Sequence, residues 1–469
     1  MRPILFLSSI LIYSLLWGCD KTQLVKALDA QVADSTANPN NIVVSNTVKQ
    51  PIALGIDAER LWHWRGYLKD QMAQLAVGEM NTAYIRVAIN IAYEREEGVI
   101  NVSAYDNILE MMNAMKAERS TIKFFASPQP LQEAYTDAEK DSIWGGSVPW
   151  SPYPAWIQEW VHNGTKWVKK ANGFHVDKLT QYYADYLNFM KDEGFDIAYL
   201  DLSNEQTIIQ PSHAKYIKDH LPTLLDAGVN MPLLIAPSTY SVQGGINWLD
   251  SVDAANGEQD GFDIASIHNT GGSGSLSEFA SSAATWGKAA WNTEMHAWTG
   301  DSLGAEVMNS AILWEHLRSG FVGLDTWLFF GPLGGTGHWM IGAHWNNGQV
   351  LKTVKYEIFK QVVNNANGGN YVEVSSPDED LITAAFLKDN VLSVWVLNTG
   401  SAEITDQVID LDGRNIAGKT IEVINWHGGL TYDNNEQAGE SSSFVAADPD
   451  HFTYDLDGES LHFFKIDLN

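Results

Sequence analysis

Short apolar runs recur along the first two thirds of the chain, and each is followed by polar residues and then by a helix-like or loop-like stretch. The runs are Ile52–Ile56, Ala83–Ile89, Thr121–Ala126, Asp196–Leu202, Pro232–Ala236, Phe262–Ile267, Lys288–Trp291 and Phe321–Phe329. Several are apolar at consecutive positions, which is typical of strands buried on both faces. Three segments between them carry apolar residues at helical spacing, namely Asp106–Ala117, Val176–Met190 and Ser310–Ser319.

Eight such units over about 275 residues favour a (β/α)8 barrel, which is a common single domain of that size. A doubly wound open sheet is the main alternative, but it usually carries a glycine-rich phosphate turn after an early strand. The sequence shows no such turn. We therefore predict an α/β fold with a TIM barrel over residues 42–368.

The pattern changes from about Tyr371, where apolar and polar residues begin to alternate. Alternating runs occur at Leu392–Leu397, Phe452–Asp455 and Leu461–Ile466. The dipeptide Asp457-Gly458 separates the last two, and Asp-Gly between alternating strands is typical of a hairpin because the turn needs positive φ. We predict an antiparallel β-sandwich over residues 369–469. Residues 42–50 also look strand-like and could pair with this sandwich.

The N-terminal segment predicts export. Arg2 is followed by the apolar run Ile4–Trp17, which is too short to span a bilayer comfortably, and then by Gly18 and Cys19. Leu16–Cys19 resembles the lipobox of bacterial lipoproteins, in which the cysteine is lipidated and becomes the first mature residue. An ordinary cleaved signal with an incidental cysteine is the alternative. We expect a lipoprotein signal over residues 1–19, a polar tether over residues 20–41, and a lipid anchor in a bacterial membrane, at its periplasmic face or on the cell surface.

Composition and charge narrow the class of protein. Hydrophobic residues make up 45% of the chain and charged residues 19%, which excludes a disordered protein and supplies a large core. The 29 basic residues face 58 acidic ones, for a net charge of -29. Such a field repels phosphate backbones and argues against nucleic acid as a partner. It also keeps an exported protein soluble.

Candidate chemistry lies at the C-terminal ends of the predicted barrel strands, where barrel enzymes gather their functional groups. Glu205 follows the predicted fourth strand and Glu294 lies on the predicted seventh. Two carboxylates facing one cleft is the arrangement that glycoside hydrolysis needs, because one protonates the leaving oxygen and the other attacks or activates water. A lone glutamate at a strand end is usually a solvated surface residue. The prediction of a catalytic site therefore rests on both glutamates together.

The motifs around these glutamates resemble those of clan A glycoside hydrolases. Ser203-Asn204-Glu205 looks like the acid/base signature of that clan, and Trp291–Glu294 looks like its nucleophile strand. Phe124–Pro128 and His268 are similar to segments of glycoside hydrolase family 30, which also joins a barrel to a β-sandwich. Three features depart from that family. Gln206 stands where the family usually has proline, and Thr270 stands where it usually has an aromatic residue. The loop Ser127–Pro130 lacks the tryptophan that is usual there.

The resemblance implies a retaining mechanism without a metal or organic cofactor. Glu294 would be the nucleophile and Glu205 the acid/base. Asn204 would hydrogen-bond the sugar 2-hydroxyl, and Arg86 would hold Glu294 ionised. His268 would orient a carboxylate or contact the sugar.

Further polar and aromatic residues near the strand ends are candidates for sugar binding, namely Trp62, Trp64, Tyr240, His296 and Trp327. Indoles stack on sugar C–H faces, although large aromatic residues more often pack in a core. The tryptophan-rich stretch Trp144–Trp167 lies in a long insertion after the third strand, where it either walls the cleft or forms a satellite core.

The sequence thus predicts a glycoside hydrolase that cleaves β-linked polysaccharide or its oligosaccharides, with xylan, β-glucan and algal galactans such as agar or porphyran all possible substrates. The alternative is a catalytically silent lipoprotein that binds carbohydrate and captures glycans. Retention of both Glu205 and Glu294 argues against this alternative, because binding alone needs no acid–nucleophile pair.

Overall fold

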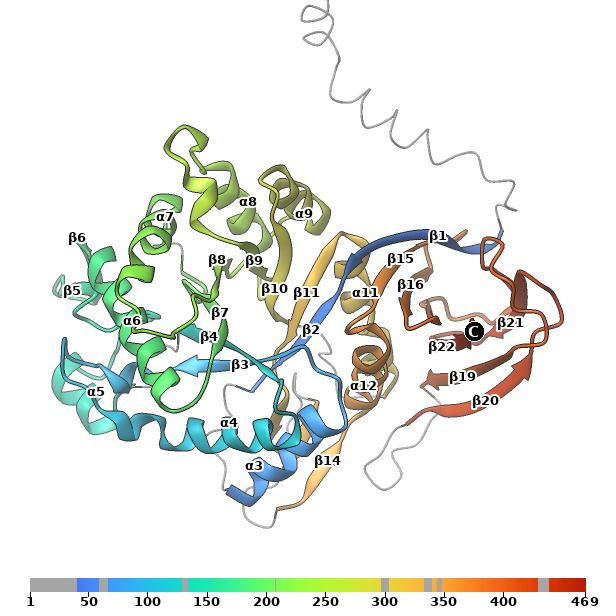
Figure 1. Cartoon of the computed structure of the whole chain (residues 1–469), viewed down its shortest axis with the longest axis horizontal. Helices are drawn as coiled ribbons and strands as arrows, with labels where there is room; N and C mark the ends of the chain where they lie inside the picture. Colours follow the sequence, from blue (N-terminus) through green and yellow to red (C-terminus); the bar gives the residue numbers. More distant parts are fainter. Residues whose placement is uncertain are drawn as a thin grey trace, which may run out of the picture.

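The computed structural model contains a closed barrel and a large β-sheet that packs beside it (Figure 1). The structure describes residues 40–58, 66–128, 134–206, 208–296, 303–332, 340–343, 348–428 and 438–469. Cys19, Trp62 and Trp64 lie outside these residues, as do the signal segment and nearly all of the tether. Among the described residues, no helix combines the length and the apolar character needed to cross a bilayer.

The barrel consists of eight parallel strands in the described part of the chain, and it closes in the order β10-β11-β2-β3-β4-β7-β8-β9. The strands are β2 (Ala53–Asp57), β3 (Tyr84–Ile89), β4 (Lys123–Pro128), β7 (Ile197–Asp201), β8 (Leu233–Thr239), β9 (Ile264–His268), β10 (Ala289–Met295) and β11 (Phe321–Thr326). Each coincides with one of the predicted runs. The predicted TIM barrel is confirmed.

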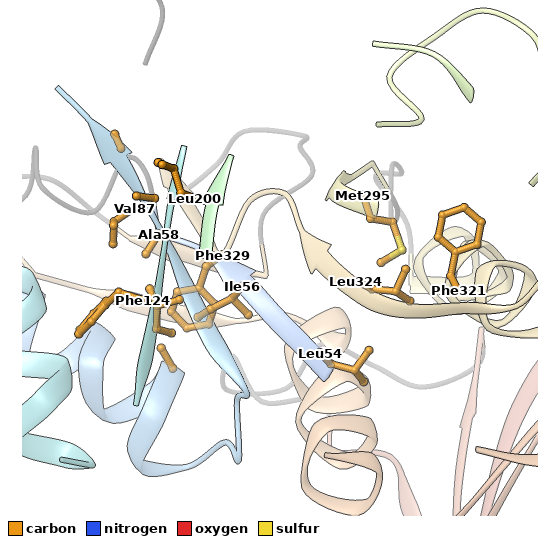
Figure 2. Packing of buried hydrophobic residues seen from close by; sticks show 14 of the residues in the cluster. Leu54, Ile56, Ala58, Val87, Phe124, Leu200, Met295, Phe321, Leu324 and Phe329 are labelled. Atoms are coloured by element: carbon orange, nitrogen blue, oxygen red, sulfur yellow. The ribbon is translucent and has the colours of Figure 1, made fainter. Parts of the chain in front are cut away.

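Helices surround the barrel. They are α3 (Gly66–Ala73), α4 (Asp106–Glu118), α5 (Asp137–Trp144), α6 (Val176–Asp192), α7 (Pro211–His220), α8 (Val242–Asp250), α9 (Leu276–Thr285), α10 (Leu303–Met308), α11 (Ala311–Arg318) and α12 (Val354–Ala366). Alternate strand residues point outward against them and form the main hydrophobic core. Leu54, Ile56 and Leu324 belong to this layer, and Leu54 lies beside α12 (Figure 2).

Short elements complete the connections. They are the helical turns η2 (Gln74–Gly78), η3 (Ile91–Tyr93), η4 (Val102–Tyr105), η6 (Leu221–Thr223), η7 (Ala254–Asn256) and η8 (Glu258–Gly261), and the strands β5 (Gln158–His162), β6 (Trp167–Phe174), β12 (Phe330–Pro332), β13 (Ile341–Ala343) and β14 (Val350–Lys352). β5 and β6 form an antiparallel hairpin within the long insertion that separates β4 from α6.

An aromatic layer closes the inside of the barrel and forms the floor beneath the strand ends. Tyr84 and Trp291 stack with ring centroids 5.1 Å apart. Two glycines make room for these rings. A Cβ on Gly55 would lie 2.1 Å from Cε2 of Tyr84, and one on Gly323 would lie 2.2 Å from the Trp291 indole. Because interiors are close-packed, neither position accepts a larger residue without a shift of the layer.

The second sheet has nine strands in the order β20-β19-β22-β17-β16-β15-β1-β18-β21. They are β1 (Ile42–Pro51), β15 (Asn370–Ser375), β16 (Leu381–Lys388), β17 (Val391–Asn398), β18 (Ile404–Asp410), β19 (Thr420–His427), β20 (Glu440–Val445), β21 (His451–Leu456) and β22 (Ser460–Asp467). All neighbours are antiparallel except β1 and β18. The predicted β-sandwich fold is confirmed, and β1 runs from it directly into β2 of the barrel (Figure 1).

The predicted hairpin at Asp457-Gly458 is wrong. β21 pairs with β18, whereas β22 pairs with β17 and β19, so the dipeptide connects two separate parts of the sheet. The two-residue hairpin turn lies instead at Asp389-Asn390, both with positive φ, between the paired strands β16 and β17. An Asp-Gly pair supplies the backbone freedom for a sharp turn, but it does not determine which strands pair across it.

The sandwich packs on the helices that follow the last barrel strands. Trp314 of α11 meets Trp395 of β17 with ring centroids 5.1 Å apart, and Trp395 stacks on Phe463 of β22 at 4.4 Å. All three side chains are buried in the same hydrophobic cluster as the barrel core. The barrel and the sandwich therefore bury apolar surface against each other, and exposing this surface to water would cost free energy.

Candidate active site

The C-terminal ends of the barrel strands bring together five of the predicted residues, Arg86, Asn204, Glu205, His268 and Glu294. Glu205 follows β7, the fourth barrel strand, and Glu294 lies on β10, the seventh. These two glutamates and His268 contribute one oxygen or nitrogen each to a group whose atoms all lie within 4.8 Å of one another. The two carboxylates therefore face each other across the barrel mouth.

Glu294 points inward because β10 contains a bulge. Asn292 points outward, where its Nδ2 lies 3.0 Å from Nε2 of His316 on α11. Thr293 points inward, where its hydroxyl lies 3.1 Å from the Ser238 hydroxyl. Regular alternation would turn Glu294 outward again. The register against β9 shifts by one residue between Asn292 and Glu294, which aims two successive side chains into the barrel.

Arg86 of β3 is the charged centre of the site and is 2% exposed. Its Nη1 donates to Asp57 at the end of β2 and to Oε2 of Glu294 at 2.9 Å. Its Nη2 donates to Oγ of Ser127 at 3.0 Å and to Oδ1 of Asn204 at 3.2 Å. One guanidinium thus holds side chains from four other strands or strand ends in fixed positions.

Opposing effects act on the pKa of Glu294. Burial of its carboxyl group by itself raises the pKa. The neighbouring His268 and Arg86, together with a hydrogen bond from His296, lower the pKa by more than burial raises it. The net result is a pKa well below the usual glutamate value, so Glu294 is ionised at neutral pH although it is only 8% exposed.

Glu205 is held in an uncommon backbone conformation, with φ of 56°. Its N–H donates to the carbonyl of Ser238 at 2.9 Å, which ties this turn to the end of β8. Left-handed backbone in a residue with a side chain persists where surrounding contacts hold it, and such positions gather at functional sites. The turn places the Glu205 side chain over the barrel mouth rather than along the strand.

Among the described residues, two side chains lie within hydrogen-bond distance of the Glu205 carboxyl group. Oε1 accepts a hydrogen bond from the Thr270 hydroxyl at 2.8 Å and lies 3.2 Å from Nδ1 of His268. The same Nδ1 lies 3.7 Å from Oε2 of Glu294, so His268 stands between the two carboxylates. Both glutamates are therefore bridged by one imidazole while each keeps its own further partner.

The donor set of Glu205, His268 and Glu294 is close enough to hold one small cation. However, Oε2 of Glu294 already accepts a hydrogen bond from Arg86. A guanidinium at hydrogen-bond distance repels a metal ion from the same oxygen, and it supplies the positive charge that a metal would otherwise provide. The arrangement fits a metal-free ion pair better than a metal centre.

A layer of buried polar side chains lies between the aromatic floor and the two glutamates. Asp201 at the end of β7 accepts hydrogen bonds from Ser238 at 2.7 Å and Ser127 at 3.2 Å, and burial raises its pKa to about 6. Asp325 of β11 is fully buried, and burial together with the nearby Asp57 charge raises its pKa well above the usual aspartate value. Asp325 therefore keeps its proton to higher pH than an exposed aspartate does.

His296 and Trp327 stand beside Glu294. Nε2 of His296 lies 3.2 Å from Oε1 of Glu294, and its ring stacks on Trp327 with centroids 4.4 Å apart. Asn269 accepts the His296 backbone N–H at 2.9 Å and so fixes the position of the imidazole. Tyr240, by contrast, is 48% exposed and packs against Gly271, without a bond to either glutamate among the described residues.

Several residues of the site were not among the predicted ones. Asp57 and Asp201 each end a barrel strand, so position alone could have indicated them. Asp325 lies two residues after Gly323 on the same inward face, where alternation along β11 could have indicated it. Thr270 stood out only as a departure from the family pattern, and its bond to Glu205 was not foreseen.

No family model matches this chain, and no curated protein matches it. Solved structures do. A GH30 endoxylanase from Clostridium papyrosolvens C71 has a TM-score of 0.64 at 19% identity, over 91% of this chain and all (100%) of that one. GH30 xylanase C from Talaromyces cellulolyticus has a TM-score of 0.66 at 14% identity, over 91% of this chain and 99% of that one.

A GH51 arabinofuranosidase from Xanthomonas axonopodis pv. citri is more distant, with a TM-score of 0.58 at 10% identity over 91% of this chain and 99% of that one. At such low sequence identities, the structural similarity establishes the fold alone. This chain has the barrel-and-sandwich fold of these glycoside hydrolases, as the motif resemblance implied.

We expect the free energy of unfolding of Asp325→Asn to increase relative to that of the unchanged protein as pH rises from 4 to 7. Burial raises the pKa of Asp325 in the folded state, so the unchanged protein loses stability as pH rises above the unfolded aspartate pKa of about 3.9, by at most about 1.4 kcal/mol per pH unit. Asparagine has nearly the same shape and no proton to lose. Urea unfolding at pH 4, 5.5 and 7 measures the difference.

The exposed Asp70 provides the matched control, because Asp70→Asn removes a carboxyl group that lies at the surface. A stability difference for Asp325→Asn that stays constant across this pH range, or that shrinks as pH rises, would contradict the raised pKa of the buried carboxyl group.

Proposed function

We propose that this protein is a retaining glycoside hydrolase that cleaves β-glycosidic bonds in a polysaccharide or its oligosaccharides. The observation that carries the proposal is the pair Glu205 and Glu294 on the fourth and seventh barrel strands, with one oxygen of each no more than 4.8 Å from the other. Retaining enzymes hold their carboxyl groups about 5 to 5.5 Å apart, whereas inverting enzymes need about 6.5 Å or more to admit a water.

The surroundings of the two glutamates suit different roles. Glu294 is ionised, and Arg86 and His296 hold its two oxygens, so it is the nucleophile that attacks the anomeric carbon. Glu205 lies on the opposite side of the barrel mouth and gives its proton to the departing glycosidic oxygen as the carbon–oxygen bond breaks. A water then attacks the anomeric carbon, Glu205 takes the proton of that water, and Glu294 is released as a carboxylate.

Asn204 is oriented to contact the sugar. Its Oδ1 accepts a hydrogen bond from Arg86, so its amide NH2 group is the part that remains to donate. A donor beside the nucleophile suits the 2-hydroxyl of the bound sugar, an interaction that strengthens in the transition state of glycoside hydrolysis. Arg86 thereby positions both the nucleophile and this donor.

Xylan is the first polymer to test, because two of the solved structures with this fold are named as xylanases. β-Glucan and agar are the neutral alternatives. The net charge of -29 opposes the approach of heavily sulfated galactans such as carrageenan, at least at low salt. We therefore expect a neutral backbone.

A glycan-capturing protein without activity is the alternative function. Keeping Glu294 ionised in a buried site costs free energy of desolvation, which Arg86 and two histidines offset. Binding alone requires no such arrangement. We therefore favour an enzyme over a glycan-capturing protein. From the lipobox resemblance we also propose that the protein is exported and anchored through Cys19.

We expect reducing ends to accumulate when the protein is incubated with its polymer. Glu294→Gln and Glu205→Gln should each lower the rate at least a thousandfold, because losses of this order are typical when an essential catalytic group is removed. A reducing-end assay on xylans, β-glucans, agar, porphyran and carrageenans measures this. The exposed Glu315→Gln is the matched control and should retain full activity.

The anomeric form of the first product, followed by NMR, tests the mechanism separately, because a retaining enzyme releases the β-anomer from a β-linkage. Release of the α-anomer would overturn the double displacement. Absence of activity on every polymer, with equal binding in both glutamine variants, would favour glycan capture instead.

We expect Thr270→Val to lower kcat/KM for the polymer about fivefold, the order of one net hydrogen bond. The Thr270 hydroxyl donates to Oε1 of Glu205, and a carboxyl group that loses this partner is held less firmly in its position over the barrel mouth. Thr270→Ser keeps the hydroxyl and should keep the rate. A kcat/KM that is the same in all three proteins would contradict a positioning role for Thr270.

We expect the full chain to incorporate a fatty acid when it is produced in a bacterium supplied with labelled palmitate, and to sediment with membranes. Cys19→Ser should abolish both, because the thiol is the site of lipid attachment in the lipobox resemblance. Label that persists in Cys19→Ser would contradict the anchor.

A further inference from the structure

A pocket of about 540 Å³ lies away from the two glutamates, between the insertion after β4 and the loop after β3. Its lining combines aromatic rings with charged groups. The residues are Arg95, Glu96, Glu97, Tyr135, Ile143, Trp144, Ala155, Trp156, Glu159, Trp160 and Trp167. Its size falls within the range of about 300 to 1,000 Å³ that is usual for small-molecule sites.

The aromatic rings of the pocket are held in place by one another and by the backbone. Trp144 meets Trp167 edge to face with centroids 4.9 Å apart, and it meets Tyr135 in the same way at 5.9 Å. The indole N–H of Trp167 donates to the carbonyl of Trp144 at 2.9 Å, and that of Trp156 donates to the carbonyl of Glu94 at 2.9 Å. Rings that are fixed before binding lose little entropy when a ligand stacks on them.

The rings do more than fill a satellite core. Tyr135 and Trp144 are buried in one hydrophobic cluster with Ile91, whereas Trp160 and Trp167 pack against this cluster and are only half-buried. A packed core would close over these indoles. The open space between them leaves aromatic surface accessible to solvent, which is the surface that stacks on the C–H faces of sugar rings.

Charged side chains at the rim are held by partners and present hydrogen-bonding groups for hydroxyls. Arg95 pairs with Glu139 at 2.9 Å, and Glu97 pairs with Lys178 at 2.6 Å. Glu159 accepts hydrogen bonds from Lys170 and His175. Among the described residues, the lining contains three carboxylates and one arginine, and this charge disfavours sulfated or uronic acid chains.

The pocket belongs to the same face of the barrel as the candidate active site. Lys169 of β6 donates to the side chain of Gln206 at 3.1 Å, and Gln206 directly follows Glu205. The Tyr153 hydroxyl donates to the carbonyl of Leu202 at 2.6 Å. The insertion that carries the pocket is therefore anchored to the turn that carries Glu205. In the described part of the chain, no lining residue bonds to either glutamate.

We propose that this pocket is a second glycan-binding site, which takes a short stretch of an uncharged polysaccharide and holds the chain on the catalytic face. The proposal rests on the proposed function for the identity of the ligand as a carbohydrate. Stacking of sugar rings on Trp160 and Trp167 supplies affinity. The carboxylates at the rim accept hydrogen bonds from sugar hydroxyl groups, and Arg95 donates hydrogen bonds to them. Occupation of the pocket raises the local concentration of polymer at the barrel mouth.

The first test measures binding without turnover. In a Glu294→Gln background, we expect Trp160→Ala to weaken binding of neutral xylan or β-glucan about five- to tenfold in affinity electrophoresis, the order expected for removal of a central aromatic contact. Trp150→Ala is the matched control, because Trp150 lies in the same insertion, is 45% exposed and does not line the pocket. Ile143→Arg obstructs the pocket from an exposed position and should act as Trp160→Ala does, so that the test does not depend on one variant.

The second test uses the active protein. Trp160→Ala and Ile143→Arg should raise KM for the polymer several-fold and leave kcat/KM for a short oligosaccharide unchanged. Equal polymer binding and equal KM in the unchanged, Trp160→Ala and Ile143→Arg proteins would overturn the second site, whatever the catalytic activity. Tighter retention of carrageenan than of neutral polymers would overturn its preference for an uncharged chain.

The two tests separate this proposal from the proposed function. Polymer binding that falls in both pocket variants, in a protein without hydrolytic activity, supports the pocket and contradicts the enzyme. Hydrolysis with unaltered binding in the pocket variants supports the enzyme and contradicts the pocket.

Discussion

The buried guanidinium of Arg86 is the interaction on which the candidate active site depends. It carries the positive charge that allows Asp57 and Glu294 to stand inside the barrel, and it also holds Ser127 and Asn204. An isolated carboxylate in that environment would take up a proton, as the raised pKa of Asp325 shows for a neighbour without a hydrogen-bond partner among the described residues. The charge of Glu294 is thus a property of the assembled site.

Local irregularities aim the two glutamates. A regular β10 would turn Glu294 outward after Thr293, and a regular turn after β7 would not give Glu205 its left-handed backbone. The bulge and the turn are tolerated because well-ordered layers support them. Below them lie the hydroxyls and carboxyls around Asp201, and below those lies the stack of Tyr84 on Trp291. The regular strands of the barrel make the site rigid, whereas the β10 bulge and the turn at Glu205 orient the two catalytic candidates.

The insertion after β4 extends this arrangement beyond the barrel mouth. Its contacts with Gln206 and Leu202 tie the tryptophan-lined pocket to the turn of Glu205. A polysaccharide has many sugar rings in a row, so a pocket away from Glu205 and Glu294 can add affinity without touching the bond that is cleaved. The carboxylates in the described lining of the pocket and the net charge of -29 both disfavour a polyanionic ligand.

The sequence by itself determined the eight barrel strands, the sandwich and the pairing of Glu205 with Glu294, because apolar runs and short motifs are local features that one strand or turn encodes. Only the tertiary structure decided the rest. The connection at Asp457-Gly458, the raised pKa of Asp325 and the contact of Thr270 with Glu205 each depend on residues distant in the chain. Strand partners, desolvation and the distance between charges exist only after the chain has folded, so no local pattern encodes them.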